Sequence, residues 1–263
     1  MAVYLSGVGL CAPGLPDWPA GRAVLAGQRP YRRDEPMRFD RVRLPSNEAR
    51  RATLTVRLAL QAADEALAVA ELDARRCGAV FACSGGNTEA LDALCRALIQ
   101  PGRPLSPSQF NHSVHNAPLG YWSIATGSLQ PAVSVGAYDA SFAAGLLEAF
   151  ALARLEDRPV VLVAYDTPPP PALQPFRPVA APFGVALALT PERLADGVVR
   201  LDGLRIRAGA ADAMPEGELE RLRLSNPAAR SLPLLRGLAI GRTGAVALPY
   251  LADARLELRV EPC

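Results

Sequence analysis

The stretch "PAVSVGAYDASFAAGLLEAF", Pro131–Phe150, joins two kinds of periodicity. Residues 132–137 form an apolar, alternating run typical of a strand, and residues 140–150 are small and favour a helix. A strand that runs directly into a helix places the residue between them at the helix N-terminus, where free amide groups and the helix dipole favour negative charge. The one acidic residue at this junction is Asp139. The stretch therefore predicts a βα unit, with Asp139 either as a catalytic group or as the cap of the helix.

Further strands and helices are predicted on both sides of this unit. We expect a buried strand in "AVYLSGVGL", one helix from about Glu48 to about Ala70, and a strand with a tight turn in "CGAVFACSGG". Asn87 is the predicted N-cap of the next helix, and one further helix, beginning at "SPSQFNHS", ends at Gly127. After a return strand over 158–166, the runs "FGVALAL" and "GVVRLDGLRI" predict an antiparallel pair. Strands that alternate with helices indicate an α/β fold.

The pattern changes after about residue 206. Residues 207–263 contain a polar stretch, a helix in "NPAARSLPLLRGLA" and two late strands, and they are too short to repeat the first part. We therefore predict one large domain over 1–206 and a short αβ extension over 207–263 that packs on it.

Composition excludes several classes of function. All 28 basic residues are Arg, because the chain contains no Lys, and this removes Schiff-base, pyridoxal-phosphate and phosphate-loop lysine chemistry. A net charge of +2 without a basic, aromatic-rich run argues against nucleic acid as a partner. The five scattered cysteines predict neither a disulfide framework nor a zinc site. We find neither a signal peptide nor a membrane-spanning run, so we expect a cytoplasmic protein.

The candidate catalytic groups each have a structural alternative. Cys83, at the end of a strand, could be a nucleophile but has no adjacent base, so a buried structural cysteine is favoured. His112 and His115 could share a helix face as metal ligands, yet no acidic or cysteine ligand accompanies them, which favours hydrogen-bonded structural roles. For Asp139 the role of helix cap is favoured, because a carboxylate that caps a helix makes a poor base.

The segment "SVHNAPLGYWSIATGSLQPAVSVGAYDAS" resembles the β-ketoacyl synthase family of the thiolase fold. The positions that match without gaps are Asn116, Gly120, Ser123, Ile124, Gly127, Pro131 and Ser141. On this alignment, the family's catalytic cysteine falls on Asp139. The resemblance extends over roughly the first 200 residues. It implies a thiolase-like α/β fold in which helices flank a mixed, mainly parallel sheet, with the C-terminal half of the fold missing or heavily shortened.

The departures from the family pattern carry the functional prediction. In a ketosynthase the cysteine accepts the acyl chain, and two later histidines and a lysine support decarboxylation and the developing enolate. Here the cysteine is replaced, no histidine follows His115 and no lysine is present. The resemblance therefore implies a subunit that is not catalytic on its own and needs no cofactor or metal. The segments "SFAAGLLEA" and "NPAARSLPLL" of this chain resemble sequences of the chain-length-factor-like proteins of aryl polyene and related pigment clusters.

Such a subunit would form a heterodimer with an active ketosynthase and would meet acyl carrier protein transiently in fatty-acid or polyketide-type elongation. The resemblance implies that the strand pairing with the partner is formed by Ala132, Val133, Ser134, Val135, Gly136 and Ala137. The residues implied at the acyl tunnel or interface are Gln109, Phe110, His112, His115, Asn116, Tyr138, Asp139 and Phe142. Two alternatives stay open. They are an enzyme that transfers or hydrolyses acyl thioesters with Cys83 or Asp139, and a homodimeric scaffold.

Overall fold

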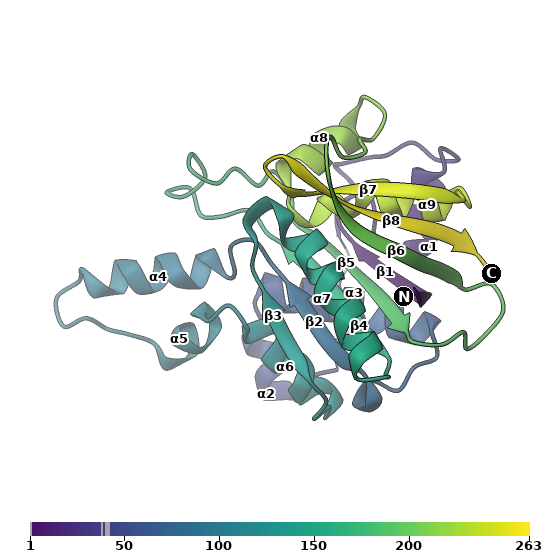
Figure 1. The fold of residues 1–263 in the computed structure, drawn as a ribbon. Coiled ribbons are helices and arrows are strands. Elements are labelled where there is room, and N and C mark those ends of the chain that lie inside the picture. Colours follow the sequence, from purple (N-terminus) through teal and green to yellow (C-terminus); the bar gives the residue numbers. More distant parts are fainter. Residues whose placement is uncertain (1, 38, 40–42) are drawn as a thin grey trace.

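The computed structural model describes residues 2–37, 39 and 43–263. Over these residues, one sheet of eight strands runs through the molecule in the order β3-β2-β4-β5-β1-β6-β8-β7 (Figure 1). The strands are β1 (Ala2–Cys11), β2 (Gly78–Ala82), β3 (Ala132–Val135), β4 (Val160–Asp166), β5 (Phe183–Thr190), β6 (Val199–Ala208), β7 (Gly244–Leu251) and β8 (Ala254–Pro262).

The sheet is mixed, as predicted, but it is not mainly parallel. β2 pairs in parallel with β3 and β4, whereas the other neighbouring strands pair antiparallel. The predicted antiparallel pairing of residues 183–189 with 197–206 is wrong, because β5 and β6 lie on opposite edges of β1. β1 is long and mostly buried, so it takes a strand on each edge. A local apolar pattern does not reveal that a distant strand lies between two consecutive ones.

The described residues form helices, most of which cover the two faces of the sheet. They are α1 (Trp18–Leu25), α2 (Ser46–Arg51), α3 (Leu54–Val69), α4 (Thr88–Leu98), α5 (Pro107–Ser113), α6 (Ala117–Thr126), α7 (Ser141–Leu155), α8 (Glu218–Ser225) and α9 (Leu232–Ala239), with short 3-10 turns η1 (Ala74–Arg76), η2 (Tyr138–Ala140) and η3 (Ala228–Ser231). Helix α7 packs on one face against β2 and β4, and α3 and α6 pack on the other. Because side chains alternate along a strand, Leu162 of β4 joins the core under α7 while Val161 and Val163 join the core under α3.

Two predicted helices are each broken in two. The predicted helix from Glu48 to Ala70 ends at Arg51 and restarts as α3, whose N-cap Thr53 accepts a hydrogen bond from the Val56 amide. The helix predicted to begin at "SPSQFNHS" ends at Ser113 and restarts as α6. Pro118 lies in the first turn of α6, the one part of a helix that tolerates the missing N–H, so a new helix has to begin there. The predicted N-cap at Asn87 and the predicted helix end at Gly127 are confirmed, and Gly127 is a left-handed C-cap.

Helix α3 lies unusually close to β1, and two glycines make this possible. A Cβ atom on Gly9 would lie 1.9 Å from the Ala62 carbonyl oxygen, and one on Gly7 would lie 2.1 Å from the Ala66 carbonyl oxygen. Neither distance leaves room for a side chain. The two glycines of "SGVGL" therefore serve helix–strand packing.

Helices α4 and α5 extend away from the sheet on the side of β3 (Figure 1). They pack mainly on each other, and several of their apolar side chains are exposed. These are Leu91, Leu98, Ile99, Leu105 and Phe110, of which the last is 62% exposed. We call residues 88–113 the arm.

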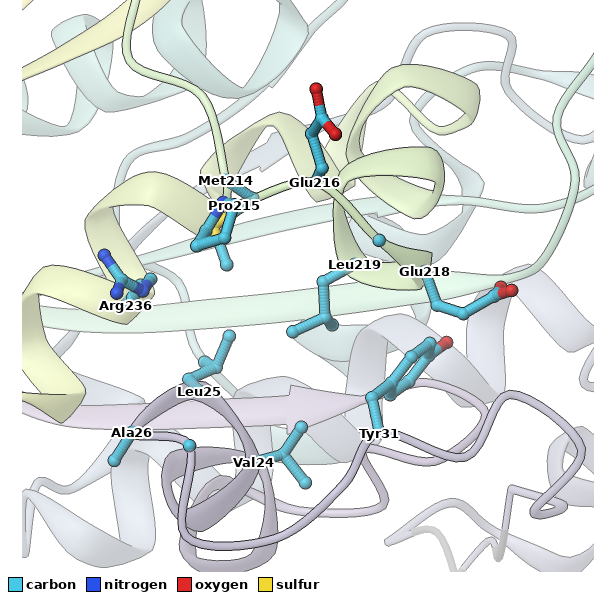
Figure 2. A pocket seen from close by; sticks show the side chains of 12 residues that line it. Val24, Leu25, Ala26, Tyr31, Met214, Pro215, Glu216, Glu218, Leu219 and Arg236 are labelled. Atoms are coloured by element: carbon cyan, nitrogen blue, oxygen red, sulfur yellow. The ribbon is translucent and has the colours of Figure 1, made fainter.

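The C-terminal strands extend the same sheet through β6. The predicted boundary at residue 206 falls inside β6, and the division into 1–206 and 207–263 stays a prediction. A cavity of about 380 Å³ lies between the end of α1, the start of α8 and α9 (Figure 2). Within the described ranges, no helix is long and apolar enough to span a bilayer.

Candidate functional site

The junction between β3 and α7 is a tight turn held by Ser141. Its Oγ accepts a hydrogen bond from the Ala137 amide at 3.0 Å and donates one to the Tyr138 carbonyl at 2.7 Å. Tyr138 has a left-handed backbone, with φ of 52°, which is strained for a residue with a bulky side chain. No side chain caps α7. The prediction that Asp139 caps this helix is therefore wrong.

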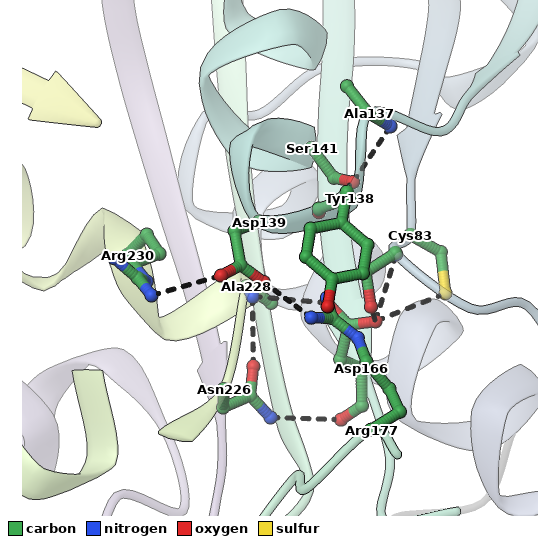
Figure 3. Close-up of polar contacts among 11 residues, drawn as sticks. Cys83, Ala137, Tyr138, Asp139, Ser141, Asp166, Arg177, Asn226, Ala228 and Arg230 are labelled. Carbon is green, nitrogen blue, oxygen red and sulfur yellow. Dashed lines mark hydrogen bonds and ion pairs between the residues drawn. The ribbon is translucent and has the colours of Figure 1, made fainter. Parts of the chain in front are cut away.

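Asp139 instead forms ion pairs with two arginines that come from distant parts of the chain (Figure 3). Arg177 reaches one carboxylate oxygen at 2.6 Å, and Arg230 reaches the other at 3.3 Å. The Arg177 guanidinium also lies 3.7 Å from the centre of the Tyr138 ring, at cation–π distance. Asp139 therefore links the α7 junction to the loop after β4 and to η3. We call Asp139, Arg177 and Arg230 the clamp.

The clamp is not arranged for proton transfer. Both oxygens of the Asp139 carboxylate are engaged, and a base needs a free oxygen directed at the proton it removes. Burial lowers the pKa of Arg230, and the Asp139 carboxylate opposes this by favouring the charged guanidinium. The two part-buried arginines therefore depend on Asp139 for their neutralisation.

A buried carboxylate, Asp166, connects three segments directly below the clamp. It accepts hydrogen bonds from the Ser84 amide at 2.9 Å, the Ser84 hydroxyl at 2.6 Å and the Ala228 amide at 3.1 Å. Burial raises the pKa of Asp166 to about 6, against the opposing effects of the bonds from Ser84 and Cys83 and of the charge on Arg177. Asn226 adds to this junction, because its amide nitrogen donates to the Ala181 carbonyl at 2.8 Å.

Cys83 is buried and has a structural role. It is 1% exposed, and its thiol donates to Asp166 at 3.5 Å. Burial raises the pKa of Cys83 well above its ordinary value, and the neighbouring Asp166 charge raises it further, so the thiolate is disfavoured. His115 approaches Cys83 but places Nε2 3.0 Å from the carbonyl oxygen, which requires this nitrogen to donate. The pair lacks the thiol–imidazole contact of a nucleophile and its base.

The two histidines do not form a metal site. His112 is buried and stacks on Tyr121, with ring centres 5.2 Å apart, and burial lowers its pKa so that the neutral form is favoured. His115 lies elsewhere, against Gly86 and Gly136. Within the part of the chain that the structure describes, no group of three or more His, Cys, Asp or Glu residues could hold a metal ion.

The predicted interface residues range from exposed to buried. Gln109, Phe110 and Asn116 are exposed, and Tyr138 is 63% exposed. His115, residues 133–135 and Ala137 are half-buried, whereas Ala132 and Gly136 are exposed. His112 and Phe142 are buried. Phe142 is 1% exposed and packs in the core under α7, and its assignment to the tunnel or interface stays a prediction.

Sequence reasoning missed the residues that surround Asp139. Arg177 lies 38 residues and Arg230 lies 91 residues from Asp139, and no local pattern pairs them. Asp166 could have been found, because it is the one charged residue in an otherwise apolar strand and its position at the strand end marks a buried carboxylate.

Comparison with known families decides the assignment of the fold. The model for "Beta-ketoacyl synthase, N-terminal domain" matches residues 25–225, more than half of the chain. The chain belongs to the β-ketoacyl synthase family. It has the thiolase-like fold that its sequence predicted, with a mixed sheet flanked by helices. No curated protein matches the chain.

Several solved structures have the same fold as this chain. A chain in the complex of the ketosynthase ApeO with its chain length factor ApeC from Xenorhabdus doucetiae is 22% identical, with a TM-score of 0.73, and the match covers 98% of this chain and 99% of that one. The ishigamide ketosynthase/chain length factor gives 12% identity and a TM-score of 0.74, over 100% and 99%. A β-ketoacyl synthase from Burkholderia phymatum gives 14% and 0.59, over 92% of this chain and 71% of that one. At these identities the likeness shows the fold.

Proposed function

We propose that this chain is a non-catalytic, chain-length-factor-like subunit that forms a heterodimer with an active β-ketoacyl synthase. One observation carries the proposal. At the position that aligns with the family's nucleophile, the chain has Asp139, and both of its carboxylate oxygens are engaged by arginines. The chain also has no lysine and no histidine after His115. The partner would perform the condensation on acyl carrier protein, and this subunit would help to set the length of a polyene-type acyl chain.

Strand β3 supplies the surface for pairing. It is an edge strand with β2 as its one neighbour in the sheet. The Pro131 and Val135 carbonyls accept hydrogen bonds from amides of β2 and the residue after it. Since backbone groups alternate sides along a strand, the N–H and C=O groups of Ala132 and Ser134 point to the open edge. These groups are available to pair with a strand of a second chain.

The opposite edge of the sheet is blocked. On β7, the Ala247 carbonyl accepts from the Asp212 amide at 2.8 Å, and the Ala247 amide donates to the Asp212 carboxylate at 3.2 Å. Pro249 lacks an N–H, and the ladder is irregular between Pro249 and Leu251. Such features are common protections against edge-to-edge pairing, and β3 has none of them.

The arm extends the proposed interface beyond β3. Its exposed apolar side chains have few contacts within the chain, and single chains rarely expose so many large apolar groups together. We infer that Gln109, Phe110 and Asn116 contact the partner near its acyl tunnel, together with Tyr138 at the junction. The related complexes support this arrangement, because they contain a ketosynthase with its chain length factor.

Co-purification tests the proposal. The chain is co-expressed with the ketosynthase encoded beside it, as parent, as Ser134→Pro and as the matched control Ser134→Ala. Proline removes one N–H at the open edge and leaves the hydrogen bonds to β2 intact, so the isolated chain should still fold. We expect parent and alanine variant to form a heterodimer by native mass measurement, and the proline variant to lose it.

Other outcomes would support the alternatives. A stable homodimer that does not exchange with the ketosynthase would favour the scaffold. Turnover of acyl thioesters by the chain alone, abolished by Cys83→Ala or Asp139→Ala, would favour an independent enzyme.

A further inference from the structure

The cavity between α1, α8 and α9 is a second candidate site, and it lies far along the sheet from β3. Its volume of about 380 Å³ is in the range of small-molecule sites. Val24, Leu25 and Met214 form an apolar floor that belongs to the main core, and Leu219 packs against them (Figure 2). The cavity therefore offers an apolar surface that is accessible from outside.

One end of the cavity carries a positive charge that is not ion-paired with any residue that the structure describes. Arg236 lines the cavity, and its guanidinium has no ion pair or hydrogen bond with any other residue that the structure describes. Asp212 lines a neighbouring hollow together with Arg236 but pairs with Arg242, at 3.6 Å. Arg236 is half-buried, so an anion at this end would gain from reduced solvent screening.

The other end carries a hydrogen-bonding group and negative charge. Figure 2 shows Tyr31 across the apolar side chains from Arg236, with Glu216 and Glu218 at the rim. Burial raises the pKa of Tyr31, and the Glu218 carboxylate raises it further, so the phenol keeps its proton and can donate. Glu218 forms ion pairs with Arg33 and Arg221, whereas Glu216 has no ion pair with the residues that the structure describes, so Glu216 would repel a second anionic group at this rim.

We propose that this cavity binds a small apolar monocarboxylic acid, with its carboxylate at Arg236 and its hydrocarbon body against Leu25 and Leu219. The assignment uses the polarity of the cavity, which is cationic at one end, apolar in the middle and acidic at the far rim. An arginine without a carboxylate partner is suited to bind a ligand carboxylate through paired N–H donors. A site of this kind goes beyond the proposed pairing function, because none of its residues belongs to β3 or the arm.

Calorimetric titration of the purified chain with octanoate tests the proposal. Octanol lacks the carboxylate and should bind at least about tenfold more weakly than octanoate, because a charge-assisted hydrogen bond is lost. Octanedioate has a second carboxylate and should also bind at least about tenfold more weakly, because the acidic rim repels it. Arg236→Gln should weaken octanoate binding by a similar factor. Arg22→Gln is the matched control, because Arg22 is exposed on α1 and does not line the cavity.

A second variant tests whether the ligand occupies the cavity, without changing the charge on Arg236. Ala26 lines the cavity and is half-buried, so Ala26→Trp should fill it and abolish binding while the thermal unfolding curve shows that the chain is folded. Absence of octanoate binding by the parent would overturn the proposal. So would equal affinity for octanoate and octanol, or unchanged octanoate affinity in Arg236→Gln.

Discussion

The stability of this protein should fall as pH rises through the titration of Asp166. Its folded pKa of about 6 lies above the ordinary 3.8 because the side chain is buried. The folded chain therefore binds the proton more tightly than the unfolded chain. A group of this kind adds stability that is fully present below the unfolded pKa and is lost as pH rises through the folded pKa.

The expected size follows from that difference. At 1.36 kcal/mol for each pH unit between 3.8 and about 6, Asp166 should lower the free energy of unfolding by about 2 to 3 kcal/mol between pH 4 and pH 7.5. Asp166→Asn removes the titration and keeps an oxygen that can accept from Ser84 or Ala228. The parent should therefore lose about this amount relative to the variant over the same interval.

Urea unfolding of both proteins across this pH range gives the measurement. Glu65 adds a slope of the same sign to both, because burial raises its pKa to about 7, so the difference between the two curves isolates Asp166. The control is Asp157→Asn, the same change of side chain at an exposed position. A parent–variant difference that is constant with pH, or that grows in favour of the parent at high pH, would refute the reasoning. The second result would mean that the hydrogen bonds from Ser84 and Ala228 outweigh burial.

Three further predictions concern other parts of the structure. Asp139→Ala should lower the free energy of unfolding by about 1 to 2 kcal/mol in chemical denaturation, because it leaves two part-buried arginines unpaired. Asp139→Asn should lower it by less. An unchanged free energy of unfolding in both variants would show that the clamp does not stabilise the fold. Gly9→Ala should cost about 1 to 3 kcal/mol or prevent folding, since its Cβ would overlap the backbone of α3, and an unchanged melting temperature would contradict this. Iodoacetamide should modify exposed Cys95 in the native chain and buried Cys83 only on unfolding, as read by peptide mass mapping; early labelling of Cys83 would revive it as a reactive thiol.

Much of the fold was predictable because it depends on local pattern. The βα unit around Asp139, the cap at Asn87 and the stop at Gly127 all follow from residues adjacent in sequence. The position of β6 could not be predicted in this way, because its place beside β1 depends on which distant strands compete for that edge.

In the candidate site, too, the local features could be predicted from the sequence and the contacts between distant residues could not. The sequence placed Asp139 at the junction, but it favoured a helix cap, because a cap is a local interaction. The true partners, Arg177 and Arg230, are brought in by a proline-rich loop and by η3. The burial of Phe142 was not predicted for a related reason, since an alignment gives its position in the chain but not the face of α7 that it occupies.

The unequal edges of the sheet limit how many chains can join. A sheet with two open edges can add strands at both ends and grow into a fibre. Here Asp212 and Pro249 close the edge at β7, and β3 alone is open. Once β3 has paired, the combined sheet has no free edge contributed by this chain. Growth then stops at two chains if the partner's sheet is closed in the same way, so the blocked strand β7 would make the assembly finite.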